Sequence, residues 1–597
     1  MYLPAMPVFP RLCVLVRCTL SPGANFSEPR YHINLKRVHS MRNNPGLNET
    51  ELINTKRAVI ILAAAFILGA LALSGYGLYY DEIPEGIILR QNIYEYLIRL
   101  FPEKSGVLRN FKGTVRIYES IERDHGAAVM YPVFILKLLG RIPALHAQYN
   151  AVVSGIWHSY VYVISFTAVI AFFYTGKKIL GSNAAGLLTA SFFFLSPKLF
   201  AEMHYNNKDM LLLVLTADMI ALIIRTVDTL KTEGRLNIWR MLILCLAGGL
   251  AMNLKIVGIA ITGLCGLLYI VLLIREGFPA KKITAAAAVA LLLALVFFYL
   301  LTPAMWGGIR KIADYFRYAF ENAKEFSRWD RLILFDGEIY KHSVKPLPRS
   351  YLIRMMLYTT PPYRSLFVIA GLVALILSLF THKTVNEGDY EIPVLVFSAV
   401  EFVAPMLFAA LARTHVYNSW RHFFFVYPGF VIVAAYGVMR VASFFTERKL
   451  LKTAFSALIV IMLTVTAAGI AVNHPFEHSY FNFLAAEPEK NYELDYWNVG
   501  IKEALKRVYD DCAGKEEPAL VAGANSDTEK GLRDCFDTFS YEGRIGYTDK
   551  RSNADYIIEN TTYTGMYESA PVSEDEFNVM DELYSYGNRI YVIYKRK

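Results

Sequence analysis

The 597-residue chain has few cysteines, few charged residues and no glycine-rich phosphate loop. Its six cysteines do not have the paired spacing of a structural zinc site. No strand-like run leads into a Gly-rich turn, so a nucleotide pocket of that kind is not expected. The chain also lacks the internal repeat that many secondary transporters carry. These absences direct attention to what is abundant, which is apolar sequence.

Apolar residues make up 55% of the chain and charged residues only 19%, with a mean hydropathy of +0.32. They are concentrated in long runs such as Ala58–Tyr79, Ile283–Leu301 and Leu366–Phe380 with its flanks. A helix needs roughly 20 apolar residues to cross a bilayer. The aromatic content of 14% also suits a protein with Tyr and Trp at membrane interfaces. The sequence therefore predicts a mainly α, polytopic membrane protein.

Hydropathy and length predict about eleven spanning helices. They are expected near residues 58–79, 151–174, 183–201, 208–226, 239–254, 256–274, 282–302, 363–381, 391–411, 423–442 and 453–472. Two boundaries stay open: the pair around Asn253 and Lys255 could be one broken helix, and 351–362 could extend the eighth helix or lie on the surface.

The basic turns predict the orientation. With the N-terminus inside, five turns on the same side all carry Lys or Arg, as the positive-inside rule requires. They are marked by Lys177, Arg225, Lys281, Lys383 and Arg448. An odd number of spans then places the C-terminus outside the cell membrane. We predict a cytoplasmic, disordered segment at 1–56, a membrane domain at 57–472 and an extracytoplasmic α/β domain at 473–597.

Both ends of the chain differ from the membrane part. Met1–Ser40 is a poor signal peptide because prolines interrupt its apolar run, so it is either a cytoplasmic tail or an over-extended start preceding Met41. Residues 473–597 hold 24 acidic and 14 basic side chains, in contrast to the basic remainder. Cys512 and Cys535 in this part could form a disulfide if it is external.

Three segments are predicted to share the outer face: Tyr80–Asn150, Pro303–Pro362 and the chain after Val472. In the second, Ile312, Phe316, Phe320 and Ala323 recur at helical spacing among basic residues, which indicates an interfacial amphipathic helix. The tail predicts a helix at Val499–Tyr509 and strands at Ala519–Gly523, Asp555–Asn560 and Arg589–Tyr594.

Acidic clusters bracket the first outer segment. Asp81 and Glu82 directly follow the first predicted span, where two carboxylates can act as a general base and its partner or bind a divalent cation. Asp124 and His125 lie in the cluster Glu122-Arg123-Asp124-His125-Gly126 near the second span. The alternative is that all of these are solvated loop charges.

Cations occur in two short outer turns. His204, Lys208 and Asp209 lie in the turn before the fourth span, where Lys208 opposes the positive-inside bias and suggests a phosphate contact. The alternative is a helix start capped by Asn207. Arg421 and His422 precede the tenth span, and Arg suits bidentate phosphate binding or, alternatively, snorkelling to lipid head groups. Glu401, inside the ninth span, is either functional or paired with another buried polar group.

Taken in order, these motifs resemble a known family. The Asp-Glu pair, the Glu-x-Asp-His-Gly…Tyr-Pro cluster, Ser-Pro-x-x-Phe-Ala…Tyr-Asn-Asn-Lys-Asp, the Thr-Thr-Pro turn and Trp-Arg-His-Phe…Tyr-Pro are similar to those of bacterial members of the dolichyl-phosphate-mannose protein mannosyltransferase family. The lipid A aminoarabinose transferases are more distantly similar. The resemblance covers about residues 57 to 500 and implies a GT-C glycosyltransferase fold.

The resemblance also implies a reaction. A sugar would pass from a polyprenyl-phosphate donor to a protein, lipid or cell-envelope glycan acceptor on the outer face, usually with inversion. Asp81 would be the general base, Glu82 and Asp124 would orient the acceptor or tune Asp81, and Lys208 and Arg421 would stabilise the lipid phosphate. His125, His204, Asp209 and His422 complete the candidate substrate-binding set.

Under this hypothesis no cofactor is certain and a divalent cation is left open. Membrane lipids are expected partners besides the donor and acceptor, and nucleic acid is not. The eukaryotic mannosyltransferases carry an extra domain in a late loop that this chain lacks, which weakens the case for a Ser/Thr-protein acceptor. Two other functions remain open: a transporter or lipid-sugar flippase without transferase chemistry, and a scaffold that binds partners through its acidic tail.

Overall fold

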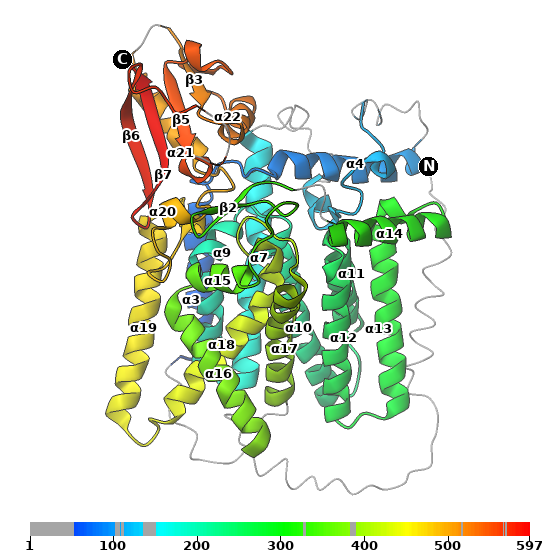
Figure 1. Cartoon of the computed structure of the whole chain (residues 1–597). Coiled ribbons are helices and arrows are strands. Elements are labelled where there is room, and N and C mark those ends of the chain that lie inside the picture. Colours follow the sequence, from blue (N-terminus) through cyan, green and yellow to red (C-terminus); the bar gives the residue numbers. More distant parts are fainter. Residues whose placement is uncertain are drawn as a thin grey trace, which may run out of the picture.

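The computed structural model describes residues 53–101, 108, 111, 113–134, 151–325, 330–381, 390–514, 517–541, 543–564, 566 and 570–597. The predictions of a disordered segment at 1–56 and of an alternative start at Met41 concern residues that lie almost wholly outside these ranges, so they stay predictions. The described chain is a long helical bundle with a small sheet domain at one end (Figure 1).

Nine helices in the described ranges are long and apolar enough to cross a membrane. They are α3 (Thr55–Ala72), α7 (Ala151–Leu180), α10 (Asp209–Glu233), α12 (Val257–Arg275), α13 (Ala280–Leu301), α16 (Pro362–Thr381), α17 (Glu391–Ala412), α18 (Tyr427–Ser443, with its preceding turn η7, Arg421–Val426) and α19 (Lys449–Val472). Two shorter apolar helices, α8 (Asn183–Phe194) and α11 (Ile238–Leu254), complete the set. All eleven predicted spans are therefore helical, and the predicted mainly α, polytopic class is confirmed.

The pattern of burial fits a bundle surrounded by lipid. Helices α10 and α18 are mostly buried and form its centre, whereas α3 and α19 have few buried residues and leave most of their apolar side chains at least partly exposed. Leu71 is 71% exposed and Phe380 is 81% exposed. Apolar surface of this extent is not stable in water, so these faces are suited to acyl chains.

The first spanning helix, α3, ends where close backbone packing requires it. The first span stops at Ala72 instead of continuing to Tyr79, because residues 73–80 leave the helix to pack against the C-terminal segment. A Cβ atom on Gly75 would lie 2.1 Å from Nε2 of His474, and one on Gly77 would lie 2.6 Å from the carbonyl oxygen of Val499. Only glycine allows this approach.

Three other boundaries are resolved. The third predicted span breaks after α8, and Pro197 begins the separate helix α9 (Pro197–Glu202). The region of Asn253 contains two helices, since α11 ends at Leu254 and α12 begins at Val257. Residues 351–358 form α15 (Tyr351–Tyr358), which is separated from α16 by a turn.

Two helices lie across the upper end of the bundle, at a steep angle to the spans (Figure 1). They are α4 (Glu82–Leu100) in the first outer segment and α14 (Ile309–Glu325) in the second, which confirms the predicted amphipathic helix. The remaining short elements at this end are η2 (Ile117–Glu119), η3 (Ala128–Met130), η5 (Pro303–Met305), β1 (Ile333–Phe335), β2 (Glu338–Tyr340), η8 (Glu477–Ser479) and α20 (Pro488–Asn491).

The sheet domain follows α19. Its five strands run in the order β4-β3-β5-β7-β6, parallel among the first three and antiparallel beyond β5. Its elements are α21 (Ile501–Asp511), β3 (Ala519–Gly523), α22 (Ser526–Thr538), β4 (Ile545–Tyr547), η9 (Arg551–Asn553), β5 (Tyr556–Asn560), η10 (Thr561–Tyr563), β6 (Phe577–Ser585) and β7 (Asn588–Arg596). The predicted helix and three strands are all present, whereas α22, β4 and β6 were not predicted. Cys512 and Cys535 are both buried and free, so they do not form the disulfide considered above.

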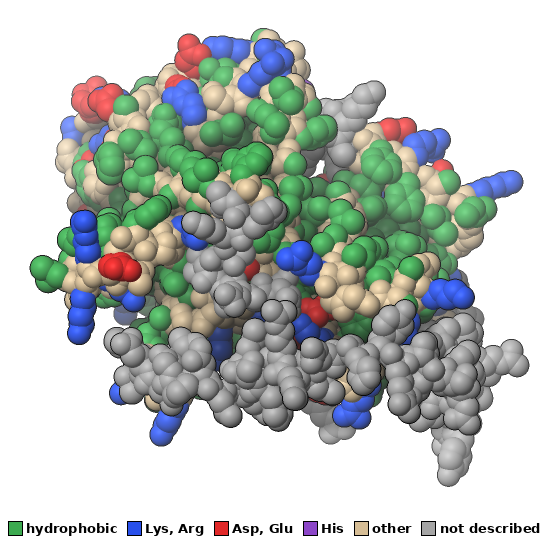
Figure 2. Space-filling model, turned by 90° about the horizontal axis from the view of Figure 1, so that it is seen from below, with side chains coloured by type: hydrophobic (Ala, Val, Ile, Leu, Met, Phe, Trp, Pro, Cys, Tyr) green, Lys and Arg blue, Asp and Glu red, His purple; other side chains and the backbone are tan. Residues whose placement is uncertain are grey.

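The opposite end of the bundle carries basic turns. Figure 2 views the molecule from this end and shows Lys and Arg side chains projecting at several places around it. Two lysines near these turns form ion pairs: Lys178 pairs with Asp228 at 2.7 Å and Lys231 pairs with Glu276 at 2.8 Å. The distribution is the one on which the predicted orientation depends, and that orientation stays a prediction.

Candidate active site

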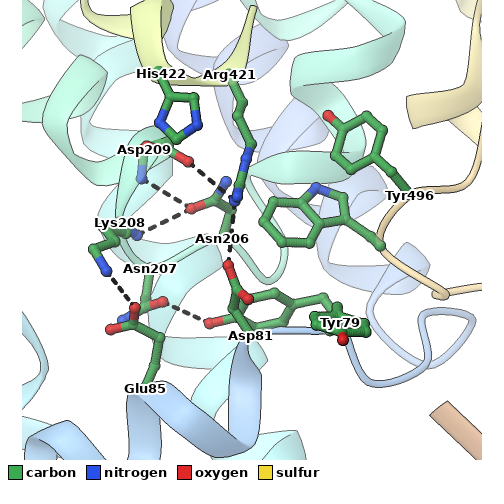
Figure 3. Close-up of polar contacts among 12 residues, drawn as sticks. Tyr79, Asp81, Glu85, Asn206, Asn207, Lys208, Asp209, Arg421, His422 and Tyr496 are labelled. Atoms are coloured by element: carbon green, nitrogen blue, oxygen red, sulfur yellow. Dashed lines mark hydrogen bonds and ion pairs between the residues drawn. The ribbon is translucent and has the colours of Figure 1, made fainter. Parts of the chain in front are cut away.

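Three segments far apart in the sequence meet at the upper end of the bundle, beside the sheet domain. Asp81 immediately precedes α4, Asp209 is the first residue of α10, and Arg421 opens η7. Figure 3 shows Arg421 reaching down between Asp209 and Asp81. Acidic side chains are favourable at helix N-termini because of the positive end of the helix dipole, which explains why α4 and α10 both begin with them.

Arg421 lies at the centre of this cluster. Its Nη1 atom donates to Oδ2 of Asp81 at 3.2 Å and lies 3.6 Å from Oδ2 of Asp209. Its guanidinium also lies 4.9 Å from the centre of the Tyr417 ring and 4.3 Å from that of Trp497. The side chain is 93% buried, so this geometry is held by packing and not by loose snorkelling.

Lys255 is a second cation of the cluster, and the sequence analysis did not select it. Its ammonium donates to Oδ1 of Asp209 and lies 3.4 Å from Nδ1 of His422. Burial lowers its pKa, while the carboxylate of Asp209 opposes that shift. Asp209 therefore bridges Lys255 and Arg421. The only sign of its role in the sequence is that a lysine stands at the break between two apolar helices.

Lys208 faces the other side of Asp209. Its ammonium donates to Oε1 of Glu85 at 2.6 Å and lies 3.0 Å from Nδ1 of His125. Burial lowers the pKa of Lys208, but the carboxylate of Glu85 outweighs it and keeps the pKa above its ordinary value. The backbone N–H groups of Lys208 and Asp209 both donate to Oδ1 of Asn206, which holds the start of α10 in place.

Asp81 and Arg421 open into a pocket between the bundle and the sheet domain. The pocket is lined by five acidic or basic residues, four tyrosines, a leucine and an asparagine. They are Tyr80, Asp81, Arg331, Leu332, Tyr417, Asn418, Arg421, Glu493, Tyr496, Asp527 and Tyr563. The Asp81 side chain is 28% exposed, so a ligand can reach it. On the outer side, Nη1 of Arg331 donates to the Tyr80 hydroxyl at 3.1 Å and to Asp527 at 3.2 Å.

Three of the predicted residues, Glu82, Asp124 and His204, contact the surrounding helices. Glu82 is fully buried and faces α7, where Ser154 and Nε2 of His158 each contact its carboxylate at 2.8 Å. Asp124 accepts a hydrogen bond from Asn322 of α14 at 3.2 Å. His204 is buried between two backbone carbonyls, those of Phe200 and Gly69. These contacts anchor the framework around the site.

Two acids in the interior of spans, Glu401 and Asp218, have local partners. Oε2 of Glu401 accepts from the backbone N–H of Gly429 at 2.7 Å, in the first turn of α18. Asp218 accepts from the hydroxyl of Thr167 at 2.6 Å. Glu401 thus satisfies an N–H group that a helix start cannot pair internally, which is costly to leave unpaired within a membrane.

The candidate site contains carboxylates, guanidinium and ammonium groups, but within the described ranges no group of three or more His, Cys, Asp or Glu side chains is arranged to hold a metal ion. The positive charge near Asp81 and Asp209 comes from Arg421, Lys255 and Lys208. This arrangement can bind an anion beside a carboxylate that remains accessible.

No family model and no curated protein matches the chain. Among solved structures, it is similar to ArnT from Cupriavidus metallidurans bound to undecaprenyl phosphate, with 13% identity over 91% of this chain and 98% of that chain and a TM-score of 0.42. It is similar to the apo state of the same protein with 14% identity over 90% and 98% of the two chains, again with a TM-score of 0.42.

Proposed function

We propose that the chain is a membrane glycosyltransferase of the GT-C type that moves a sugar from a polyprenyl-phosphate donor to an acceptor on the outer membrane face. The supporting observation is that Arg421 joins an accessible pocket carboxylate, Asp81, to the buried carboxylate of Asp209, which also pairs with Lys255, at the upper end of the bundle. The motif resemblance favours the same reaction.

The donor phosphate binds at the cationic part of the cluster. Arg421 supplies a planar fork that matches phosphate oxygens, with Lys255 and Lys208 as point charges on either side of Asp209. His422 and His125 lie against these lysines. Because the leaving group is already a phosphate, stabilising its growing charge and positioning the sugar supply most of the catalysis.

Asp81 acts as the general base. As the acceptor oxygen attacks the anomeric carbon, the acceptor proton passes to the Asp81 carboxylate and the bond from the anomeric carbon to the phosphate oxygen breaks, with inversion. Arg421 pairs with Asp81 and holds its carboxylate at the pocket. Glu82 and Asp124 act indirectly, since they fix the start of α4 and the turn that carries His125.

The topology fits this scheme. The proposal places residues 1–56 in the cytoplasm, the membrane domain at 57–472 with its upper end on the outer face, and the domain 473–597 outside. The acceptor then reaches the pocket from the aqueous side, beside Arg331 and Asp527. A protein, a lipid or a cell-envelope glycan each offers the hydroxyl group that the reaction needs.

The test compares Asp81→Asn with Asp314→Asn, an exposed carboxylate of α14 that pairs with Arg317. Membranes from a deletion strain that expresses each variant are supplied with the native lipid-linked sugars, and incorporation of labelled sugar is measured. Asp81→Asn should remove transfer while membrane insertion and yield stay normal, and Asp314→Asn should match the wild type. Full transfer by Asp81→Asn would remove Asp81 from the mechanism.

A further inference from the structure

Glu202, at the end of α9, is a fully buried carboxylate that lies behind the site. Three side-chain donors converge on it. Nδ2 of Asn206 donates to Oε2 at 2.7 Å, while Nε1 of Trp497 at 2.8 Å and the hydroxyl of Tyr496 at 3.2 Å donate to Oε1. The chain brings these donors together from the start of α10 and from the segment after α19.

Each oxygen of Glu202 leads to a different side of the cluster. Through Oε2 it fixes the side chain of Asn206. The side-chain oxygen Oδ1 of Asn206 in turn accepts hydrogen bonds from the backbone N–H groups of Lys208 and Asp209. Through Oε1 it fixes the indole of Trp497, on which the guanidinium of Arg421 lies at 4.3 Å. One carboxylate thus connects to the start of α10 through Asn206 and to the guanidinium of Arg421 through Trp497.

We propose that Glu202 is a positioning residue that sets the separation between Arg421 and the start of α10, and with it the geometry of the phosphate site. This inference rests on the proposed function. Glu202 does not line the pocket, so it acts through Trp497 and Asn206 and does not touch the substrate.

The chemistry of the donors requires a carboxylate at this place. All three partners donate, and an ionised carboxylate accepts at both oxygens. Burial raises the pKa of Glu202, and the positive charge of Lys198, whose ammonium donates to the backbone oxygen of His478 at 2.7 Å, opposes this shift. Glutamine has nearly the same shape but places an NH2 group at one of the two positions, where it meets another donor and displaces either Asn206 or Trp497.

The experiment measures binding of two probes to purified full-length protein in nanodiscs: undecaprenyl phosphate, and undecaprenol, which lacks the phosphate. The dissociation constant for undecaprenol divided by that for undecaprenyl phosphate gives a ratio that reports the phosphate contacts alone. Glu202→Gln should lower this ratio by about tenfold, because tenfold corresponds to one displaced charge-assisted hydrogen bond. The affinity for undecaprenol should not change.

Two further variants make the result specific. Trp497→Phe removes the indole N–H donor together with part of the ring on which the guanidinium of Arg421 lies, so it should lower the same ratio. Adding it to Glu202→Gln should cause less than the sum of the two losses. Glu477→Gln makes the same chemical change at a fully buried carboxylate that accepts from Tyr76 at 3.0 Å, away from the cluster. It should lower the melting temperature and leave the ratio unchanged.

The outcomes separate the two proposals. If Glu202→Gln weakens both probes equally, or if it and Trp497→Phe both keep the wild-type ratio, the positioning role is wrong. If the wild-type protein itself does not prefer the phosphate-bearing lipid, the proposed function fails, whatever Glu202 does.

Discussion

Arg421 donates a hydrogen bond to Asp81 over 3.2 Å, although the two residues lie 340 positions apart in the sequence. The contact joins the first outer segment to the start of the tenth predicted span. It also pairs the proposed base with the proposed phosphate ligand, so an incoming phosphate would compete with Asp81 for the same guanidinium. The geometry of Arg421 is therefore expected to matter as much as its charge.

Arg421→Lys should reduce transfer although it keeps the positive charge. A lysine ammonium lacks the planar fork and the stacking surface that Arg421 presents to Trp497 and Tyr417. We expect kcat/KM to fall by about 10- to 100-fold, the size of one lost charge-assisted hydrogen bond. Arg317→Lys, on the exposed face of α14, is the control. A kcat/KM within twofold of the wild type would contradict the role given to Arg421.

Lys255→Met should destabilise the fold, because it leaves the buried carboxylate of Asp209 without one of its two cations. We expect a loss of about 3 kcal/mol in the free energy of unfolding. The double variant with Asp209→Asn should recover most of that stability and none of the transfer activity. Unfolding of the purified variants in mixed micelles measures the first effect, and a double variant no more stable than the single one would contradict the pairing.

The sequence predicted those parts of the molecule that depend on local pattern. The spans follow from long apolar runs, and Lys208 and Arg421 are conspicuous because charged residues are rare at such positions. Lys255 and Glu85 were missed because their significance depends on partners from other helices, which no local spacing reveals. Asp81 and Glu82 are adjacent in the chain, yet they point in different directions: Asp81 precedes α4 and contacts Arg421, whereas Glu82 begins α4 and contacts His158 of α7.

The end of the first span shows a related limit. Residues 73–79 are apolar enough to continue α3, and hydropathy alone predicted that they would. They leave the helix because Gly75 and Gly77 pack directly against His474 and Val499, which follow about 400 residues later. Propensity is a weak guide where such tertiary contact decides the backbone path.

Substitutions at Glu401 distinguish the transferase hypothesis from that of a proton-coupled transporter. If its carboxylate only accepts the N–H of Gly429, then Glu401→Gln keeps that bond and should leave stability and transfer unchanged. Glu401→Leu leaves the N–H unpaired and should cost about 1 to 3 kcal/mol of stability without altering transfer per folded molecule. Loss of function in Glu401→Gln would instead indicate that the group must ionise, as a transporter requires.

Glu493 should give the protein a specific pH dependence of stability. Burial raises the pKa of this pocket carboxyl from 4.5 to about 8, against the opposing effects of the Leu334 backbone N–H and Arg421. The folded state then binds one proton more than the unfolded state between these two pH values. The contribution of Glu493 to stability is therefore full below about pH 4.5 and is lost as the pH rises towards 8.

Glu493→Gln keeps the shape of the protonated group but cannot titrate, so its melting temperature should gain on that of the wild type as the pH is raised through this range. Glu574→Gln, at an exposed position of the same domain, should follow the wild type throughout. Thermal unfolding of the three proteins, measured in one detergent from about pH 5 to pH 9, decides the matter. A constant difference between Glu493→Gln and the wild type would mean that Glu493 is ionised in the folded protein at every pH tested.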